Sequence, residues 1–190
     1  SKENRMPRVV SGKFKGTRLS APKGEKTRPT SDKVKEALFS IIQMRIPGTR
    51  FLDLYAGSGQ IGLEALSRGA AEVVMVEHSR SVAEIIFSNI VKLHVEKETE
   101  IIVSETQAAL RKLGETGRQF DLIFMDPPYA DTPSAFLKIS ELIEKYDLLS
   151  EVGTLIVEHS GDTIFDGNVI NLTLSRRCKY GLTLLTFYNR

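Results

Sequence analysis

Short, nearly continuous apolar runs alternate along this chain with longer stretches in which apolar residues recur every three or four positions. The first pattern predicts buried strands, and the second predicts the helices that cover them. Strands are expected at 50–55, 72–77, 100–103, 120–125 and 154–158. One helix is expected to begin just after residues 30–31, and others at 81–93, 105–113 and 134–145. This alternation predicts an α/β domain with a parallel sheet. A closing hairpin, 169–177 with 182–188, adds an antiparallel strand, which such sheets tolerate.

The composition is that of a globular protein, with 190 residues, of which 41% are hydrophobic and 26% charged. The single Cys178 excludes an intramolecular disulfide and a zinc site made of cysteines alone. His78, His94 and His159 show no metal-ligand spacing, so no metal is expected. The chain has neither a leader-like start nor an apolar run of the roughly 18 to 20 residues that a membrane helix needs. We therefore expect a soluble, cytoplasmic protein.

Charge is distributed unevenly along the chain. Residues 1–36 carry eleven basic and four acidic side chains, a net charge of +7 in a chain whose total is +2, so the remainder carries −5. A basic arm on an acidic body predicts a polyanionic partner such as RNA, and a solvated terminus is the alternative. Apolar residues and glycines within the arm predict a hairpin of 8–11 with 17–21. The expected division is an arm at 1–29 and a catalytic domain at 30–190.

A glycine-rich loop, Gly57-Ser58-Gly59-Gln60-Ile61-Gly62, follows the first expected strand and precedes a helix. With Glu77 at the end of the next strand, it matches the fingerprint of a dinucleotide site. Asp53, just before the loop, argues against that interpretation because a carboxylate repels a pyrophosphate. S-adenosylmethionine, which carries an ammonium, a sulfonium and no phosphate, suits these residues better.

The motif Asp126-Pro127-Pro128-Tyr129 follows the strand at 120–125 and belongs on the same rim as the glycine loop. Two prolines fix the backbone, so the Asp126 carboxylate and a neighbouring carbonyl can accept both hydrogens of an exocyclic amine. Tyr129 offers a flat face on which a base can stack. These groups can present a weakly nucleophilic amine nitrogen to a methyl donor.

These motifs together resemble the class I S-adenosylmethionine-dependent amino-methyltransferases. The arm sequence Arg8–Gly16, with the segment from Arg28-Pro29-Thr30 to Phe39, is similar to the RsmD family of bacterial 16S rRNA guanine-N2 methyltransferases. The resemblance implies a Rossmann-like, seven-stranded, mostly parallel sheet with one antiparallel strand. It implies methylation of a guanine in the small ribosomal subunit or its assembly intermediate by a monomer that releases S-adenosylhomocysteine.

The resemblance also assigns roles to residues. Asp126, Pro127 and Tyr129 are the expected catalytic group, and Arg8, Lys13, Lys15, Arg18 and Arg28 the expected RNA contacts. The expected cofactor contacts are Thr30, Asp53, Tyr55, Ala56, Gly57, Ser58, Gly59, Glu77, His78, Glu105 and Asp126. Glu105 departs from the family's usual aspartate near the adenine. Arg176, Arg177 and Lys179 are either a further RNA surface or solvated turn residues.

Three alternatives remain open at this stage. An adenine-N6 methyltransferase uses a similar four-residue motif but usually adds a recognition domain, for which 190 residues leave little room. A protein glutamine methyltransferase tends to carry asparagine where this chain has Asp126. A catalytically silent ribosome-assembly factor with this fold is opposed by the intact Asp53, Glu77 and Asp126.

Overall fold

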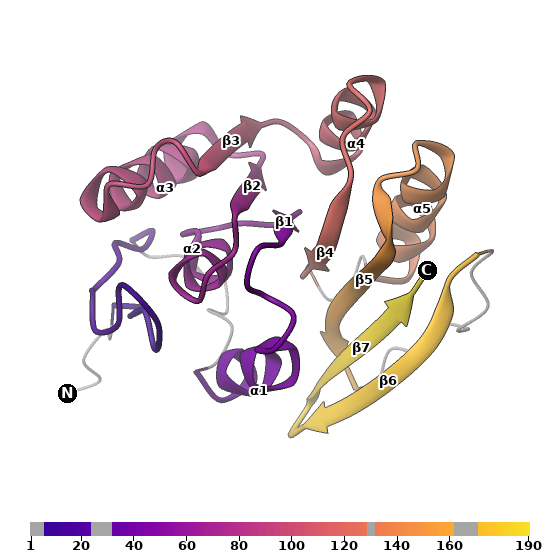
Figure 1. The fold of residues 1–190 in the computed structure, drawn as a ribbon, viewed down its shortest axis with the longest axis horizontal. Coiled ribbons are helices and arrows are strands. Elements are labelled where there is room, and N and C mark those ends of the chain that lie inside the picture. Colours follow the sequence, from indigo (N-terminus) through magenta and orange to yellow (C-terminus); the bar gives the residue numbers. More distant parts are fainter. Residues whose placement is uncertain (1–5, 24–31, 129–131, 162–170) are drawn as a thin grey trace.

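The computed structural model describes residues 6–23, 32–128, 132–161 and 171–190. Within these ranges one sheet of seven strands is covered by helices on both faces (Figure 1). The strands are β1 (Arg50–Asp53), β2 (Glu72–Glu77), β3 (Thr99–Val103), β4 (Phe120–Met125), β5 (Leu149–Ser160), β6 (Thr173–Tyr180) and β7 (Thr183–Asn189). The helices are α1 (Asp32–Ile42), α2 (Gln60–Ser67), α3 (Arg80–Leu93), α4 (Thr106–Glu115) and α5 (Thr132–Lys145).

The strand order is β3-β2-β1-β4-β5-β7-β6. Neighbours from β3 to β5 pair in parallel, whereas β7 runs antiparallel to both β5 and β6. This arrangement confirms the predicted Rossmann-like sheet with one antiparallel strand. The carboxyl ends of β1, β2, β4 and β5 consequently meet at one rim, where open α/β sheets bind their ligands.

Alternate residues of the central strands face two separate cores. Leu122 and Phe124 of β4 pack in the cluster that contains residues of α1, α2 and α3. Ile123 and Met125 pack in the cluster built with α4 and α5. Both faces of β4 are therefore buried, which explains its nearly continuous apolar sequence.

Two element boundaries differ from the prediction. β5 begins at Leu149, which pairs with Phe120, rather than at 154. The polar and glycine-containing stretch 150–153 resembles a turn in sequence, but it continues the strand across an irregularity in its pairing with β4. In the closing hairpin, β6 extends to Tyr180, so the turn lies at 181–182. The pairing of β6 with β7 shifts register earlier in the strand, between Leu174 and Arg176.

The predicted N-terminal hairpin is wrong in detail. Its two segments meet in a single antiparallel bridge between Arg8 and Arg18, beside the hydrogen bonds Val9 N to Thr17 O and Gly16 N to Val9 O. The neighbouring backbone groups of the arm bond to α2. Val10 N donates to one carboxylate oxygen of Glu64 and Ser11 N to the other.

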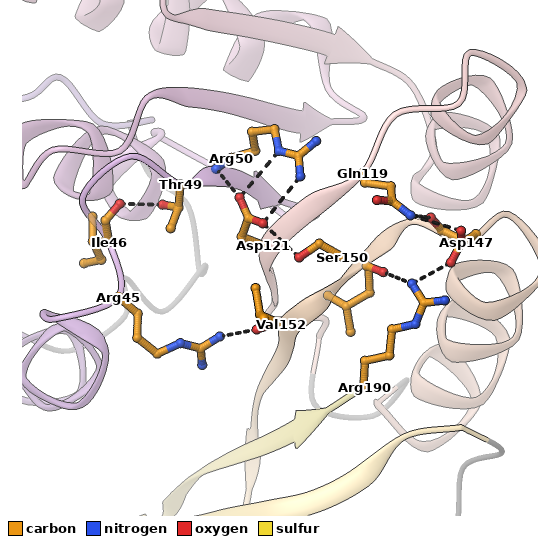
Figure 2. Close-up of polar contacts among 11 residues, drawn as sticks. Arg45, Ile46, Thr49, Arg50, Gln119, Asp121, Asp147, Ser150, Val152 and Arg190 are labelled. Atoms are coloured by element: carbon orange, nitrogen blue, oxygen red, sulfur yellow. Dashed lines mark hydrogen bonds and ion pairs between the residues drawn. The ribbon is translucent and has the colours of Figure 1, made fainter.

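Polar side chains join the opposite rim of the sheet, where β1, β4 and β5 begin (Figure 2). Arg50 N and the Ser150 hydroxyl both donate to the Asp121 carboxylate, at 2.9 and 2.8 Å. Burial disfavours the charged form of Asp121, but these donors outweigh it and lower its pKa. Arg190 pairs with Asp147 at 2.6 Å, which attaches the end of the chain to the same region. This network fixes the strands at the rim away from the glycine loop.

Candidate active site

Three carboxylates lie at the carboxyl ends of adjacent strands. Asp53 ends β1, Glu77 ends β2 and Asp126 follows β4, and β1 lies between the other two. Asp53 aligns with Met75 on one side and Phe124 on the other, so the parallel pairing brings the acids together. The sheet therefore assembles a negative site from residues far apart in sequence.

Asp53 is the most unusual group of the site. Its side chain is 1% exposed, and its Oδ1 accepts a hydrogen bond from Tyr55 N at 3.2 Å. Its buried Oδ2 has no hydrogen-bond partner among the described residues. Burial, with smaller contributions from the charges of Asp126 and Glu77, outweighs the hydrogen bond from Tyr55 N and raises the pKa of Asp53 to about 7. A buried carboxylate oxygen of this kind is costly unless a cation or donor arrives from outside the chain.

The glycine loop surrounds this acid. Gly57 and Gly59 adopt left-handed backbone conformations, with φ of 55° and 82°. A side chain on Gly57 would meet no atom within 4 Å, so the loop has open space beside it. At Gly62, by contrast, a Cβ would lie 2.8 Å from Val73 Cγ1, which explains the close packing of α2 on β2. The loop thus combines a tight helix start with room for a ligand.

Glu77 joins the glycine loop to the start of α3. Its carboxylate accepts hydrogen bonds from Gly57 N at 2.9 Å and from Ser79 N at 3.1 Å, and His78 Nδ1 lies 3.3 Å away. Glu77 is 7% exposed, whereas the His78 side chain is mostly exposed. A carboxylate offers about four lone-pair positions, so Glu77 retains capacity for a ligand while it holds the loop.

The remaining predicted cofactor residues border the same rim. Ala56 N donates to Val76 O at 2.9 Å, which lays the loop over the end of β2. Ser58 O accepts a hydrogen bond from the Asn89 side chain, and Tyr55 packs half-buried beside the second core. Glu105 is exposed and immediately precedes α4, with no side-chain bond to that helix.

The Asp-Pro-Pro motif leaves β4 on the same rim. Asp126 is half-buried, Pro127 is buried and Pro128 is exposed. The Thr132 hydroxyl donates to Pro128 O at 3.4 Å, so α5 begins directly behind the motif. Tyr129, together with the predicted residues Arg28 and Thr30, lies outside the described residues.

The arm packs along α2 through side chains that the sequence analysis missed. Glu64 is fully buried, binds the backbone of residues 10–11 and pairs with Lys35 at 3.1 Å and Arg68 at 3.0 Å. Burial favours protonation, but these partners outweigh it and lower the pKa of Glu64. A lone acid inside the apolar sequence of α2 was the available signal.

Asn89 is a second residue that the sequence analysis missed, and it connects the arm to the glycine loop. Its side chain is 1% exposed, accepts from Ser20 N at 2.8 Å and donates to the carbonyls of Ser20 and Ser58 at 3.0 Å. One buried amide therefore holds the end of the arm and the middle of the glycine loop together. Its position in an amphipathic helix gave no sign of this role.

The predicted RNA contacts of the arm are at the surface. Arg8, Lys13, Lys15 and Arg18 are exposed, while Val9 and Leu19 between them are buried in the core. Arg8 and Arg18 face each other across the antiparallel bridge. Like charges in this position destabilise a β pair, so packing does not explain the choice of two arginines here.

Two kinds of feature are absent from the described ranges. No group of three or more His, Cys, Asp or Glu side chains there could hold a metal ion. None of the helices in those ranges is both long enough and apolar enough to cross a membrane.

The family model described as conserved hypothetical protein 95 matches residues 7–189. The chain belongs to this family. Among relatives, the protein YlbH of Bacillus subtilis is 36% identical over 96% of this chain and 98% of its own length. Ribosomal RNA small subunit methyltransferase D of Escherichia coli is 29% identical over 96% of this chain and 89% of its own length. The predicted RsmD membership is confirmed by these matches.

Solved structures of similar proteins share the fold of this RsmD-family chain. The yhhF protein of Escherichia coli superposes with a TM-score of 0.85 at 29% identity, over 97% of each chain. A hypothetical protein from Thermus thermophilus gives a TM-score of 0.82 at 27% identity, over 97% of this chain and 100% of its own. The class I methyltransferase fold predicted from the motifs is thereby confirmed.

Proposed function

We propose that this RsmD-family protein transfers a methyl group from S-adenosylmethionine to the exocyclic N2 amine of a guanine in 16S rRNA. The observation that carries the proposal is the buried Asp53 Oδ2, which has no partner in the described part of the chain and lies near Glu77, Asp126 and an open glycine loop. This set of acceptors suits a cationic cofactor and an amine donor. It does not suit a phosphate-bearing dinucleotide.

The fit to the cofactor rests on residues of this chain. Asp53, with its unbonded Oδ2 among the described residues, would bind an ammonium group, and the open side of the loop at Gly57 would admit the methionine part. Glu77, with His78 beside it, would bind the ribose hydroxyls, and Glu105 would contact the adenine. The cofactor supplies an activated methyl group on a sulfonium centre.

Amine recognition is assigned to the motif after β4. Asp126 accepts one hydrogen of the target amine and a backbone carbonyl of the motif accepts the other, with Pro127 holding the backbone rigid. Acceptors in this position orient the nitrogen lone pair and stabilise the positive charge that develops as the new bond forms. In this proposal Tyr129 stacks on the base, which must first leave its RNA helix.

The RNA partner is supported by the names of the relatives and by the arm. The Escherichia coli and Haemophilus influenzae relatives are both named ribosomal RNA small subunit methyltransferase D. Arg8, Lys13, Lys15 and Arg18 would bind phosphates, and Arg28 would extend their surface toward the catalytic domain, 30–190. The protein is proposed to act as a cytoplasmic monomer on the small subunit or an assembly intermediate.

The test is methyl transfer from radiolabelled S-adenosylmethionine to naked 16S rRNA, small subunits, DNA and protein in parallel, followed by nucleoside analysis. We expect label in N2-methylguanosine from one of the two ribosomal substrates. Label in N6-methyladenosine would identify an adenine methyltransferase instead, and label in none of the four would favour a silent assembly factor. The Asp126→Ala variant provides the background.

A further inference from the structure

The hairpin of β6 and β7 carries a second concentration of positive charge. Residues 171–190 contain four basic side chains and no acidic one. Residues 1–36 carry +7 and the whole chain only +2, so residues 37–170 between the two basic ends carry −9. The acidic part of the sequence, which contains Asp53, Glu77 and Asp126, is therefore preceded and followed by basic segments.

The topology places the tip of this hairpin at the catalytic rim. β6 is antiparallel to β7, which is antiparallel to β5, so β6 runs parallel to β5 and β4. Its carboxyl end therefore points toward the rim on which Asp126 follows β4. Gly161, just after β5, donates its N–H to Leu182 O at 2.8 Å and fixes the hairpin turn beside that strand end.

The basic side chains of β6 are available to a ligand. Arg176, Arg177 and Lys179 are exposed, and no carboxylate among the described residues forms an ion pair with them. Arg176 contacts Cys178 Sγ and Arg177 contacts the Thr186 hydroxyl, so both guanidinium groups keep further N–H donors. These donors match the geometry of phosphate oxygens.

The arm and the face of this hairpin that carries Arg176 flank α1 on the same side of the sheet, whereas Arg177 and Lys179 project from the opposite face of the edge strand. Val9 and Leu19 of the arm and Leu185 and Phe187 of β7 belong to one core cluster, and α1 lies between the two segments (Figure 1). The arm reaches the glycine loop after β1 through Asn89, whereas the hairpin lies beyond β5. The strand that carries Asp126 lies between β1 and β5.

We propose that Arg176, Arg177 and Lys179 form a second RNA-contact surface, which binds phosphates on the side of Asp126 opposite the arm. The inference rests on the proposed function, because it assumes an RNA substrate. RNA held at both basic segments would span the carboxylate rim, so its target base would be presented between two groups of phosphate contacts. The competing explanation is that charge on β6 only protects an exposed sheet edge from pairing with another chain.

The test compares variants by their affinity for a bacterial 16S rRNA transcript across a salt titration. The hairpin variant changes Arg176, Arg177 and Lys179 to alanine. A control with the same change in charge replaces Arg111, Lys112 and Lys138, which are exposed on α4 and α5. We expect the hairpin variant to lose on the order of sixfold in affinity per lost contact at 0.1 M salt. Its salt slope should fall by about two to three, with the control unchanged.

Charge reversal separates RNA binding from protection of the edge. R176E/K179E keeps β6 charged, so an edge-protection role predicts normal solubility and unchanged RNA affinity, which would overturn the inference. A fall in RNA affinity beyond that of the alanine variant, with S-adenosylhomocysteine binding intact, supports it. Equal RNA affinity of the hairpin variant and its control would also overturn it. If the wild-type protein binds no RNA and methylates none, the proposed function itself fails.

Discussion

Cofactor affinity is predicted to depend on pH through Asp53. The carboxylate can bind an ammonium group only when ionised, but burial and the charges of Asp126 and Glu77 raise its pKa to about 7. Binding of a cationic ligand must therefore displace a proton below neutral pH. Each unit below pH 7 is expected to weaken binding about tenfold, so affinity at pH 5 is roughly a hundredth of its plateau.

The assay is calorimetric binding of S-adenosylhomocysteine between pH 5 and pH 9. The α-amino group of the ligand neighbours a carboxylate and stays protonated over most of this range, so affinity should rise along an acidic limb and reach a plateau. Asp53→Asn should bind weakly and lose the acidic limb. His78→Gln should keep the acidic limb, which assigns it to Asp53.

Stability provides an independent check on the same group. The folded protein holds the Asp53 proton more tightly than the unfolded chain, where the ordinary pKa is 3.8. The ligand-free protein should therefore lose stability as pH rises from about 4 through 7, by about 4 kcal/mol in total. Asp53→Asn should then melt at a higher temperature than the wild type at pH 8. Two results would refute the assignment to Asp53. One is a wild-type affinity for S-adenosylhomocysteine that stays constant from pH 5 to 7, and the other is an Asp53→Asn variant that keeps the acidic limb.

Three further substitutions test the site and its supports. Asp126→Ala should abolish methyl transfer while melting temperature and S-adenosylhomocysteine binding persist, and near-normal turnover would contradict the assigned role. Glu64→Gln leaves Lys35 buried without a carboxylate and should lower the unfolding free energy by about 3 to 5 kcal/mol in urea titrations; an unchanged midpoint would exclude that pairing. Asn89→Ala should cost about 1 to 3 kcal/mol and weaken cofactor binding, because backbone groups at Ser20 and Ser58 lose their partner. Ser88→Ala, on the exposed side of α3, is its control and should change neither quantity.

The succession of strands and helices along the chain and the location of the site could be predicted because both depend on local signals. Apolar runs fix which segments become strands, and parallel pairing then brings every strand end with a polar motif to one rim. This is why Asp53, Glu77 and Asp126 were recognised as one site before their contacts were known. The first residues of β5 were missed because 150–153 resemble a turn, and only the pairing of Leu149 with Phe120 makes them a strand.

The arm could not be predicted to the same depth because long-range contacts determine its shape. The backbone of Val10 bonds to Glu64, 54 positions away, and that of Ser20 bonds to Asn89, 69 positions away. A hairpin pattern was present in the sequence, but buried side chains of α2 and α3 bind N–H groups that neighbour the hairpin bonds. No local propensity reports such long-range contacts.

In the proposed function, the distribution of charge also limits how RNA can approach the site. Exposed basic groups of the arm attract phosphates, whereas the rim presents carboxylates, which accept hydrogen bonds and repel anions. A phosphate at the rim would meet Asp53, Glu77 and Asp126 together, so the RNA backbone is kept at the basic segments. A base amine has no negative charge and donates two hydrogen bonds, so it is the part of a nucleotide that these carboxylates favour. In the proposed function, the same acids that hold the cationic cofactor therefore also select which end of the nucleotide enters the site.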